Sequence, residues 1–308
     1  RRDYSYDGVG RRTGEQWWQS GSIVSRSTFA FDAAGYLTSA QNEQGAYTFT
    51  YDALGRVTHV DELFGVGLTF TYNAVGSRLS VQDSLGGLVT STFNGVQNLT
   101  SREFTANSQQ GRIDYSYNAK NELTGETRYA NTSGSTTTAI TTITLDALGY
   151  ETARKIASGT VTLFQGTYTY DATSRITQKI ENGTTNTYAY DAADQVTREN
   201  AGTAITYDNT GNRTVSGYST TTGNRLSTDG VWTYTYDLAG NMVKRSKGAT
   251  SDTWNYSYNH NNQMVSANYS ATDGGTVTTR VTYSYDVFGN RVERQAWDGT
   301  TTTERFVV

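Results

Sequence analysis

The chain of 308 residues contains no proline and no cysteine, and it has only two histidines and two methionines. Without cysteine there can be no disulfide, thiolate nucleophile or zinc–sulfur site. Proline cannot donate a hydrogen bond to a β-ladder, so its absence suits a chain whose strands are nearly all paired. The two histidines, His59 and His260, have no serine or carboxylate partner at a spacing typical of a catalytic triad. We therefore expect no enzyme activity.

Concentrated charge and long apolar runs are also missing. The net charge is −4 and the pI is near 5.3, without a cluster of lysine and arginine that could follow a phosphate backbone, so nucleic acid is not expected as a partner. No apolar run is long enough to span a bilayer, and no signal peptide precedes the first repeat. No segment has the period of an amphipathic helix. These absences leave a polar, strand-forming chain with a mean hydropathy of −0.61.

What the chain does contain is one sequence motif that recurs thirteen times: aromatic, small residue, aromatic, Asp or Asn, and usually Gly three positions later. Residues 49–57 are the clearest copy, Phe-Thr-Tyr-Asp-Ala-Leu-Gly-Arg-Val. The Asp or Asn is named the anchor below. The first and last anchors are 279 residues apart, and the mean period of about 23 lies in the range of repeat arrays. Such a dense repeat predicts stacked units.

Three positions define each copy. The anchors are Asp7, Asp32, Asp52, Asn73, Asn94, Asn118, Asp146, Asp171, Asp191, Asp208, Asp237, Asn259 and Asp286. Twelve of them follow an aromatic residue, namely Tyr6, Phe31, Tyr51, Tyr72, Phe93, Tyr117, Tyr170, Tyr190, Tyr207, Tyr236, Tyr258 and Tyr285. Eight have glycine three positions later, namely Gly10, Gly35, Gly55, Gly76, Gly149, Gly211, Gly240 and Gly289.

This spacing predicts a β-hairpin. Aromatics two residues apart lie on one face of a strand, because side chains alternate. The anchor side chain can accept hydrogen bonds from backbone groups just after it, which starts a turn. Glycine three residues later suits a left-handed backbone, whereas Gln97 and Ser174 at that position suit it less well. An aliphatic residue at anchor plus five, present in eight copies, then supplies a cross-strand partner for the aromatics.

The predicted fold is all-β, with tandem hairpins that form one continuous, curved or spiralling antiparallel sheet. We expect residues 1–308 to form a single array of about 13 units. The stretch 217–227 resembles a degenerate half-unit, since Gly223-Asn224-Arg225-Leu226 repeats the turn and the return strand. Because the chain starts just before one copy of the motif and stops soon after another, we expect it to be a fragment of a larger protein.

The anchors have a structural role in this interpretation. Asn replaces Asp in four copies, and Asn cannot act as a general acid or a nucleophile. The sequence has no calcium-loop template, and we expect no metal and no cofactor. Arginines that recur four or five residues after an anchor are expected to lie over neighbouring tyrosines. They are Arg11, Arg56, Arg78, Arg175, Arg213 and Arg291.

The pattern aromatic-x-Tyr-Asp-x-x-Gly-Arg/Asn-aliphatic, seen at residues 49–57 and 234–242, resembles the YD repeat of RHS-repeat proteins. The resemblance covers essentially the whole chain, and residues 168–176 are a looser copy with Ser174 in place of glycine. It implies a sheet that spirals into a hollow shell. The family includes bacterial polymorphic toxins, shells of insecticidal toxin complexes, wall-associated proteins and teneurins. The proline-containing segment that closes such shells, linked to self-cleavage, has no counterpart here.

The resemblance implies a non-enzymatic scaffold, part of a shell that encloses or presents a polypeptide (toxin) cargo in an exported bacterial protein. The expected location is extracellular or on the cell surface, and the expected partner is the C-terminal cargo domain of the parent protein. Two alternatives stay open. One is extracellular adhesion to a cell-surface glycan, with Trp17 and Trp18 as contact residues, because adjacent strand residues point to opposite faces. The other is self-association through unpaired strand edges.

Overall fold

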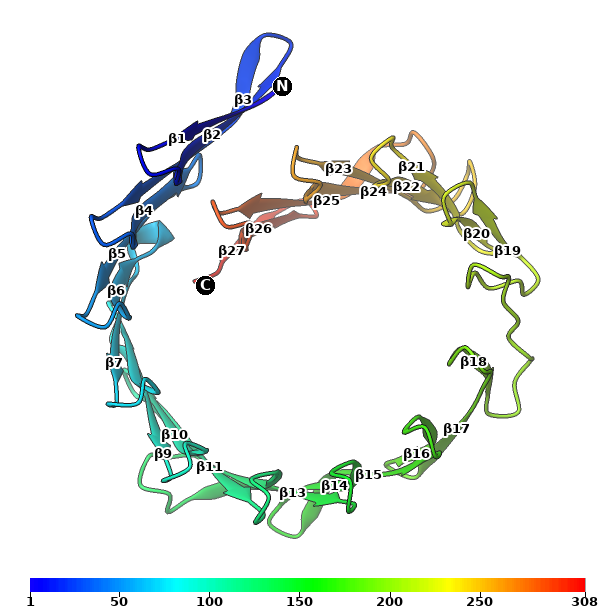
Figure 1. Cartoon of the computed structure of the whole chain (residues 1–308). Helices are drawn as coiled ribbons and strands as arrows, with labels where there is room; N and C mark the ends of the chain where they lie inside the picture. The colour runs from blue at the N-terminus through cyan, green and yellow to red at the C-terminus, as the bar shows by residue number, and fades with distance from the viewer. Residues whose placement is uncertain (308) are drawn as a thin grey trace. The chain divides into compact units, whose positions relative to one another are not determined.

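The computed structural model describes residues 1–307 and consists almost entirely of β-strands, as predicted (Figure 1). The first sheet contains β1 (Arg2–Tyr6), β2 (Arg12–Gln19), β3 (Ser22–Phe31), β4 (Leu37–Asn42), β5 (Gly45–Tyr51), β6 (Val57–Asp61), β7 (Gly67–Tyr72), β8 (Arg78–Asp83), β9 (Gly87–Phe93), β10 (Leu99–Ala106), β11 (Gln109–Tyr117), β12 (Leu123–Tyr129), β13 (Thr137–Leu145), β14 (Glu151–Ser158), β15 (Val161–Tyr170), β16 (Ile176–Glu181), β17 (Thr184–Tyr190) and β18 (Val196–Glu199). The second contains β19 (Tyr218–Thr221), β20 (Arg225–Asp229), β21 (Thr233–Tyr236), β22 (Met242–Ser246), β23 (Thr253–Tyr258), β24 (Met264–Ser270), β25 (Val277–Tyr285), β26 (Arg291–Trp297) and β27 (Thr301–Arg305). A short 3-10 turn, η1 (Leu63–Gly65), lies between β6 and β7.

Each strand pairs antiparallel with its neighbour in the sequence, so the predicted tandem hairpins are confirmed. The residue before the anchor faces the residue at anchor plus five, for example Tyr170 opposite Ile176, and the ladder shifts register just before that pair. The aromatic residue and its aliphatic partner are therefore cross-strand neighbours, as the spacing predicts.

The prediction of one continuous sheet fails at one place, because the array is divided into sheets of 18 and 9 strands. Between β18 and β19, the turn at Asp208 is flanked by an isolated bridge from Tyr207 to Arg213 and belongs to no strand of either sheet. The interval from Asp191 to Asp208 is the shortest between anchors, 17 residues. It leaves too few residues for a full outgoing strand, which explains the break.

The degenerate half-unit is a real hairpin. β19 and β20 pair around a turn in which Thr221 takes the anchor position and Asn224 has a φ of 57°. Thr220 faces Leu226, which is the same pairing as in the other hairpins. This fourteenth turn, without Asp or Asn at its start, accounts for the wide gap between Asp208 and Asp237.

The turns have the geometry that the sequence predicts. In Asp52, Oδ1 accepts hydrogen bonds from the backbone N–H of Leu54 (2.9 Å) and of Arg56 (3.0 Å), and the same pair of bonds recurs after other anchors. The residue three positions after every anchor has a positive φ, including Gln97 (66°) and Ser174 (69°). We name the five residues from an anchor to anchor plus four a YD turn.

Replacing Ser174 by glycine should stabilise the protein, because a residue with a Cβ is strained in the left-handed region. The gain in the free energy of unfolding should be about 1 kcal/mol, measured by chemical denaturation. Asn262→Gly is the matched control, since asparagine tolerates a positive φ better and should gain less. A loss of stability in Ser174→Gly would contradict this geometry.

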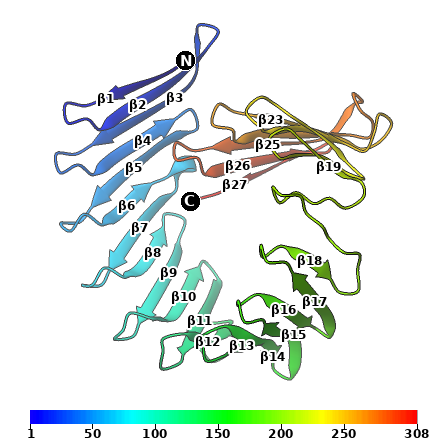
Figure 2. The same cartoon turned by 45° about the vertical axis from the view of Figure 1, so that its right-hand side comes forward.

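Apart from the turn at Asp208, which lies between the two sheets, the YD turns lie on the same border of their sheet, because each follows an odd-numbered strand in an antiparallel series. We name this the YD border, and the border formed by the turns after even-numbered strands the opposite border. Figure 2 shows the turns after β1, β3 and β5 along one border and those after β2 and β4 along the other.

The chain divides into two compact units. Unit 1 comprises Arg1–Arg56, Val60–Val66 and Thr206–Val308, and unit 2 comprises Val57–His59 and Gly67–Ile205. Among the described residues, the buried apolar side chains of unit 1 are Ala40, Tyr47, Val60, Leu63, Ala267, Val281 and Val292, and that of unit 2 is Ile143. Residues 1–307 include no helix that is both long and apolar enough to cross a membrane.

Candidate functional site

In most units that have a tyrosine before the anchor, this tyrosine joins the unit to the one before it. Its hydroxyl donates to the carbonyl at anchor plus five of the preceding unit, or at the equivalent position of the half-unit, at 2.7–2.9 Å. The pairs are Tyr51–Leu37, Tyr72–Val57, Tyr117–Leu99, Tyr170–Glu151, Tyr190–Ile176, Tyr236–Leu226, Tyr258–Met242 and Tyr285–Met264. Sequence reasoning missed this bond. The signal was present, because ten of the twelve aromatics at this position are tyrosine.

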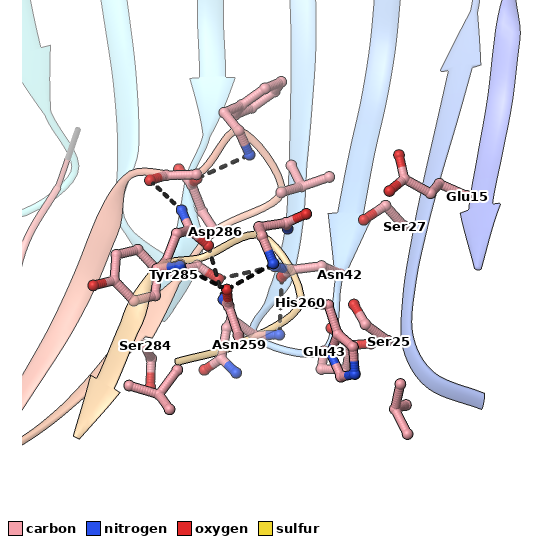
Figure 3. A pocket seen from close by; sticks show the side chains of 18 of the residues that line it. Glu15, Ser25, Ser27, Asn42, Glu43, Asn259, His260, Ser284, Tyr285 and Asp286 are labelled. Carbon is pink, nitrogen blue, oxygen red and sulfur yellow. Dashed lines mark hydrogen bonds between the residues drawn. The ribbon is translucent and has the colours of Figure 1, made fainter. Parts of the chain in front are cut away.

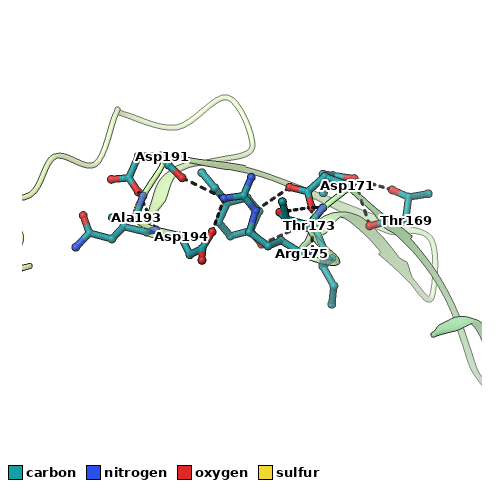
Figure 4. A network of polar contacts seen from close by, with 11 residues as sticks. Thr169, Asp171, Thr173, Arg175, Asp191, Ala193 and Asp194 are labelled. Carbon is teal, nitrogen blue, oxygen red and sulfur yellow. Dashed lines mark hydrogen bonds and ion pairs between the residues drawn. The ribbon is translucent and has the colours of Figure 1, made fainter. Parts of the chain in front are cut away.

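The residue at anchor plus four forms a second link, toward the next unit. Figure 4 shows Arg175, whose Nε donates to Asp171 Oδ2 (2.7 Å) and whose Nη1 donates to the backbone carbonyl of Asp191 (3.0 Å) and to Asp194 Oδ1 (2.7 Å). The guanidinium lies 4.7 Å from the ring centre of Tyr190. The predicted arginine–aromatic contact is thus present, and the same side chain also ties two YD turns together.

Other side chains at anchor plus four make the same link with different chemistry. Arg11 bonds the carbonyl of Asp32 (3.1 Å) and lies over Phe31, whereas Gln263 bonds the carbonyl of Gly289 (2.9 Å). Tyr36 instead stacks on Tyr51, with ring centres 4.9 Å apart. The position four residues after the anchor therefore determines the contact with the next unit more than the residue type at that position does.

The YD turns should make stability depend on pH in acid. The backbone N–H of Arg175, followed by its guanidinium, holds the pKa of Asp171 well below its ordinary value. A carboxylate with a lowered folded-state pKa contributes stability that is complete above its unfolded pKa of about 4 and is lost as the pH falls toward the folded value. We expect the melting temperature to fall between about pH 4 and pH 2, and to fall less in Asp171→Asn. An identical acid slope in that variant would show that this turn contributes nothing to the pH dependence.

In unit 1, the YD turn after β25 packs against β4 and β5. Asp286 is 5% exposed and its Oδ2 accepts a hydrogen bond from the hydroxyl of Tyr47 (2.9 Å). The side-chain amide of Asn42 donates to the carbonyl of Tyr285 (2.9 Å). Burial, followed by the bond to Asp286, raises the pKa of Tyr47, which stays neutral and donates.

The tips of two YD turns complete this contact. The ring of Phe288 lies 5.3 Å from that of Tyr47 and 6.3 Å from that of Phe49. In the YD turn after β23, His260 lies 5.5 Å from the ring of Trp17. The contact therefore brings the YD border of the second sheet onto β2–β5, near their opposite border.

A pocket of about 510 Å³ lies at this contact, within unit 1 (Figure 3). Its charged lining consists of Arg2, Arg12, Glu15, Glu43 and Asp286. Glu15 is buried, and its carboxylate accepts hydrogen bonds from Arg2 (2.6 Å), from Arg12 (3.0 Å) and from the indole N–H of Trp17 (2.6 Å). The carboxylate of Glu15 is thus occupied by donors from the protein itself. The pocket is therefore best described as part of the packing contact between the two sheets within unit 1.

The two tryptophans predicted as ligand contacts are both partly covered. The guanidinium of Arg2 lies 4.6 Å from the ring centre of Trp17, and that of Arg1 lies 5.1 Å from that of Trp18. In each tryptophan, an arginine therefore lies over a ring face that could otherwise stack on a sugar. A role for them in ligand binding stays a prediction.

The repeat positions are distributed along the YD border, and of the anchors only Asn259 and Asp286 line the pocket. Within residues 1–307 no group of three or more histidine or acidic side chains is arranged to hold a metal ion. The site is therefore a repeated structural joint, whose chemistry is hydrogen bonding and aromatic packing.

Comparison with solved structures finds the same fold in other proteins. The chain is similar to TcdB2-TccC3 (TM-score 0.68, 14% identity) and to the Tc holotoxin pore of Photorhabdus luminescens (TM-score 0.64, 15% identity). These matches cover 100% and 97% of this chain but only 19% of each of those chains. TcdB2-TccC3 without its hypervariable C-terminal region is also similar, at a TM-score of 0.55 and 15% identity over 100% of this chain and 22% of that one.

At the level of sequence, no curated protein matches the chain. The family profile of the teneurin YD-shell matches residues 87–306, which is more than half of the chain. The match begins at β9 and includes strands of both sheets, so it spans six of the eight hydroxyl-to-carbonyl joints and the docked turn after β25. The chain belongs to the teneurin YD-shell family.

Proposed function

We propose that this chain is a non-enzymatic wall segment of a YD-repeat shell, which encloses or presents a polypeptide (toxin) cargo in an exported bacterial protein. The observation that carries the proposal is the tandem array of YD hairpins, which has the fold of Tc toxin components along its whole length. A structural shell scaffold also agrees with the teneurin YD-shell family.

The two faces of the sheet support a wall. Exposure alternates along β17, where Thr187 and Ala189 are exposed and Tyr188 and Tyr190 are half-buried. One face is therefore rich in hydroxyl groups and the other is formed by tyrosines that pack side by side. Both can contact water or a polypeptide without the thick core of a globular enzyme.

The experiment uses the full-length protein that its gene encodes, with a photo-crosslinking amino acid at Thr187 or at Tyr188. These neighbours lie on opposite faces of β17. An enclosing wall predicts crosslinks to a polypeptide of the same protein from one face only, and protection of that polypeptide from added protease. Crosslinking from neither face, together with immediate digestion, would overturn the proposal. Binding to a glycan array that is lost in Trp17→Ala would instead favour the adhesion alternative.

A further inference from the structure

Three of the six YD turns of unit 2 carry a large apolar side chain at their tip. Two residues after the anchor, Val75, Val96 and Leu148 are between 62% and 79% exposed. A turn tip needs no apolar residue for its own geometry, since the anchor bonds only the backbone there. Apolar side chains that recur at one exposed position of a border indicate a surface that packs against another molecule.

Unit 1 shows what a residue at this position does when it is covered. Phe288 is also two residues after its anchor, and it packs on Tyr47 and Phe49 near the opposite border of β5. The docked turn accepts further hydrogen bonds, from Tyr47 to Asp286 and from Asn42 to the carbonyl of Tyr285. A YD border therefore fits an opposite border, and the fit is observed in this chain.

The opposite border of unit 2 also carries exposed apolar side chains, at two of its turns. Leu85 lies in the turn after β8, and Val161 and Leu163 lie at the start of β15; all three are between 55% and 70% exposed. Successive turns on either border are two strands apart, which is about 9–10 Å. Because the two borders have the same repeat, several turns of one can meet several turns of the other at once.

We propose that unit 2 associates with unit 2 of a second copy of this chain, with the YD border of one copy against the opposite border of the other. The contact uses turn tips and leaves the unpaired strand edges free. Since the two surfaces differ, each copy keeps one free border after pairing, so association continues beyond a dimer. The proposal goes beyond the role in a shell wall, because its partner is another copy.

The first experiment is sedimentation velocity at rising concentration of the whole chain and of Val75→Ser/Val96→Ser/Leu148→Ser. The wild-type chain should associate, and the triple variant should raise the apparent dissociation constant at least about tenfold. Ala74→Ser/Ala147→Ser, in two of the same turns, is the matched control and should associate like the wild type. A monomeric wild type, or a triple variant that associates equally well, would overturn the proposal; the second result would indicate pairing of strand edges.

The second experiment tests which border of one copy meets which border of the other. Because the chain has no cysteine, a crosslinker specific for thiols reacts only with the cysteine that is introduced. Copies with Val96→Cys and copies with Val161→Cys are mixed and treated with a short bismaleimide. Crosslinks between the two kinds of copy are expected. Crosslinks that form mainly between copies with Val96→Cys would overturn the pairing of unlike borders.

Discussion

Asp286→Ala is expected to lower the free energy of unfolding by about 3–4 kcal/mol, measured by chemical denaturation. Asp286 is buried, and alanine would remove the acceptor of the Tyr47 hydroxyl together with that of the backbone N–H groups of Phe288 (2.9 Å) and Asn290 (2.8 Å). Each buried donor that loses its partner costs about 1–3 kcal/mol. The effect should exceed that of any other anchor, because this turn also holds β25 and β26 against β4 and β5.

Two variants separate the turn from the docking. Asp191→Ala removes the same turn acceptor, which serves Ala193 and Gln195, from a more exposed site, and should cost only about 1 kcal/mol. Asp286→Asn should cost less than Asp286→Ala, because its Oδ1 can still accept from the two backbone N–H groups, although an amide NH2 replaces the oxygen that accepts from Tyr47. Equal losses in Asp286→Ala and Asp191→Ala would mean that the contact with Tyr47 contributes nothing.

Gly55→Val should be as damaging as Asp286→Ala, with a loss of about 4 kcal/mol in the free energy of unfolding. Gly55 has a φ of 77°, and a Cβ there would lie 2.7 Å from Cε1 of Tyr36. The substitution would both strain the backbone and push Tyr36 off its stacked position on Tyr51.

Gly10→Val isolates the backbone strain. Gly10 has a similar φ of 84°, but a Cβ there meets no atom within 4 Å. It should therefore cost only about 2 kcal/mol. If both variants were destabilised equally in thermal and chemical denaturation, the packing of Tyr36 over the next turn would be irrelevant to stability.

The hairpin itself could be predicted from the sequence because its determinants are local. Three determinants lie within a few positions of one another: the alternating aromatics, the anchor that bonds the following backbone, and the residue with a left-handed backbone. Each of them favours particular residue types, which can be recognised in the sequence. Ser174 and Gln97 adopt the predicted backbone despite their Cβ, since the anchor bonds and the ladder on both sides over-determine the turn.

What could not be predicted depends on contacts distant in the sequence. Nothing around Phe288 indicates that it meets Tyr47, which is 241 residues earlier in the chain. The division into two sheets depends on the short interval between Asp191 and Asp208. The mean period of the repeat does not reveal one short interval. The partial cover on Trp17 comes from Arg2 and His260, which sequence reasoning had no reason to place there.

The central claim is that the hydroxyl-to-carbonyl joint, where it is present, couples a unit to the one before it, as in a linear repeat protein. Native-state hydrogen exchange of Tyr190→Phe tests it directly, with Tyr115→Phe as the control, since the Tyr115 hydroxyl makes no hydrogen bond within residues 1–307. We expect protection to fall in β17 and β18. It should also fall in β15 and β16, because the backbone carbonyl of Ile176 loses the hydroxyl that donates to it, while β23–β26 should stay unchanged. Loss of protection in β17 and β18 alone would contradict the claim.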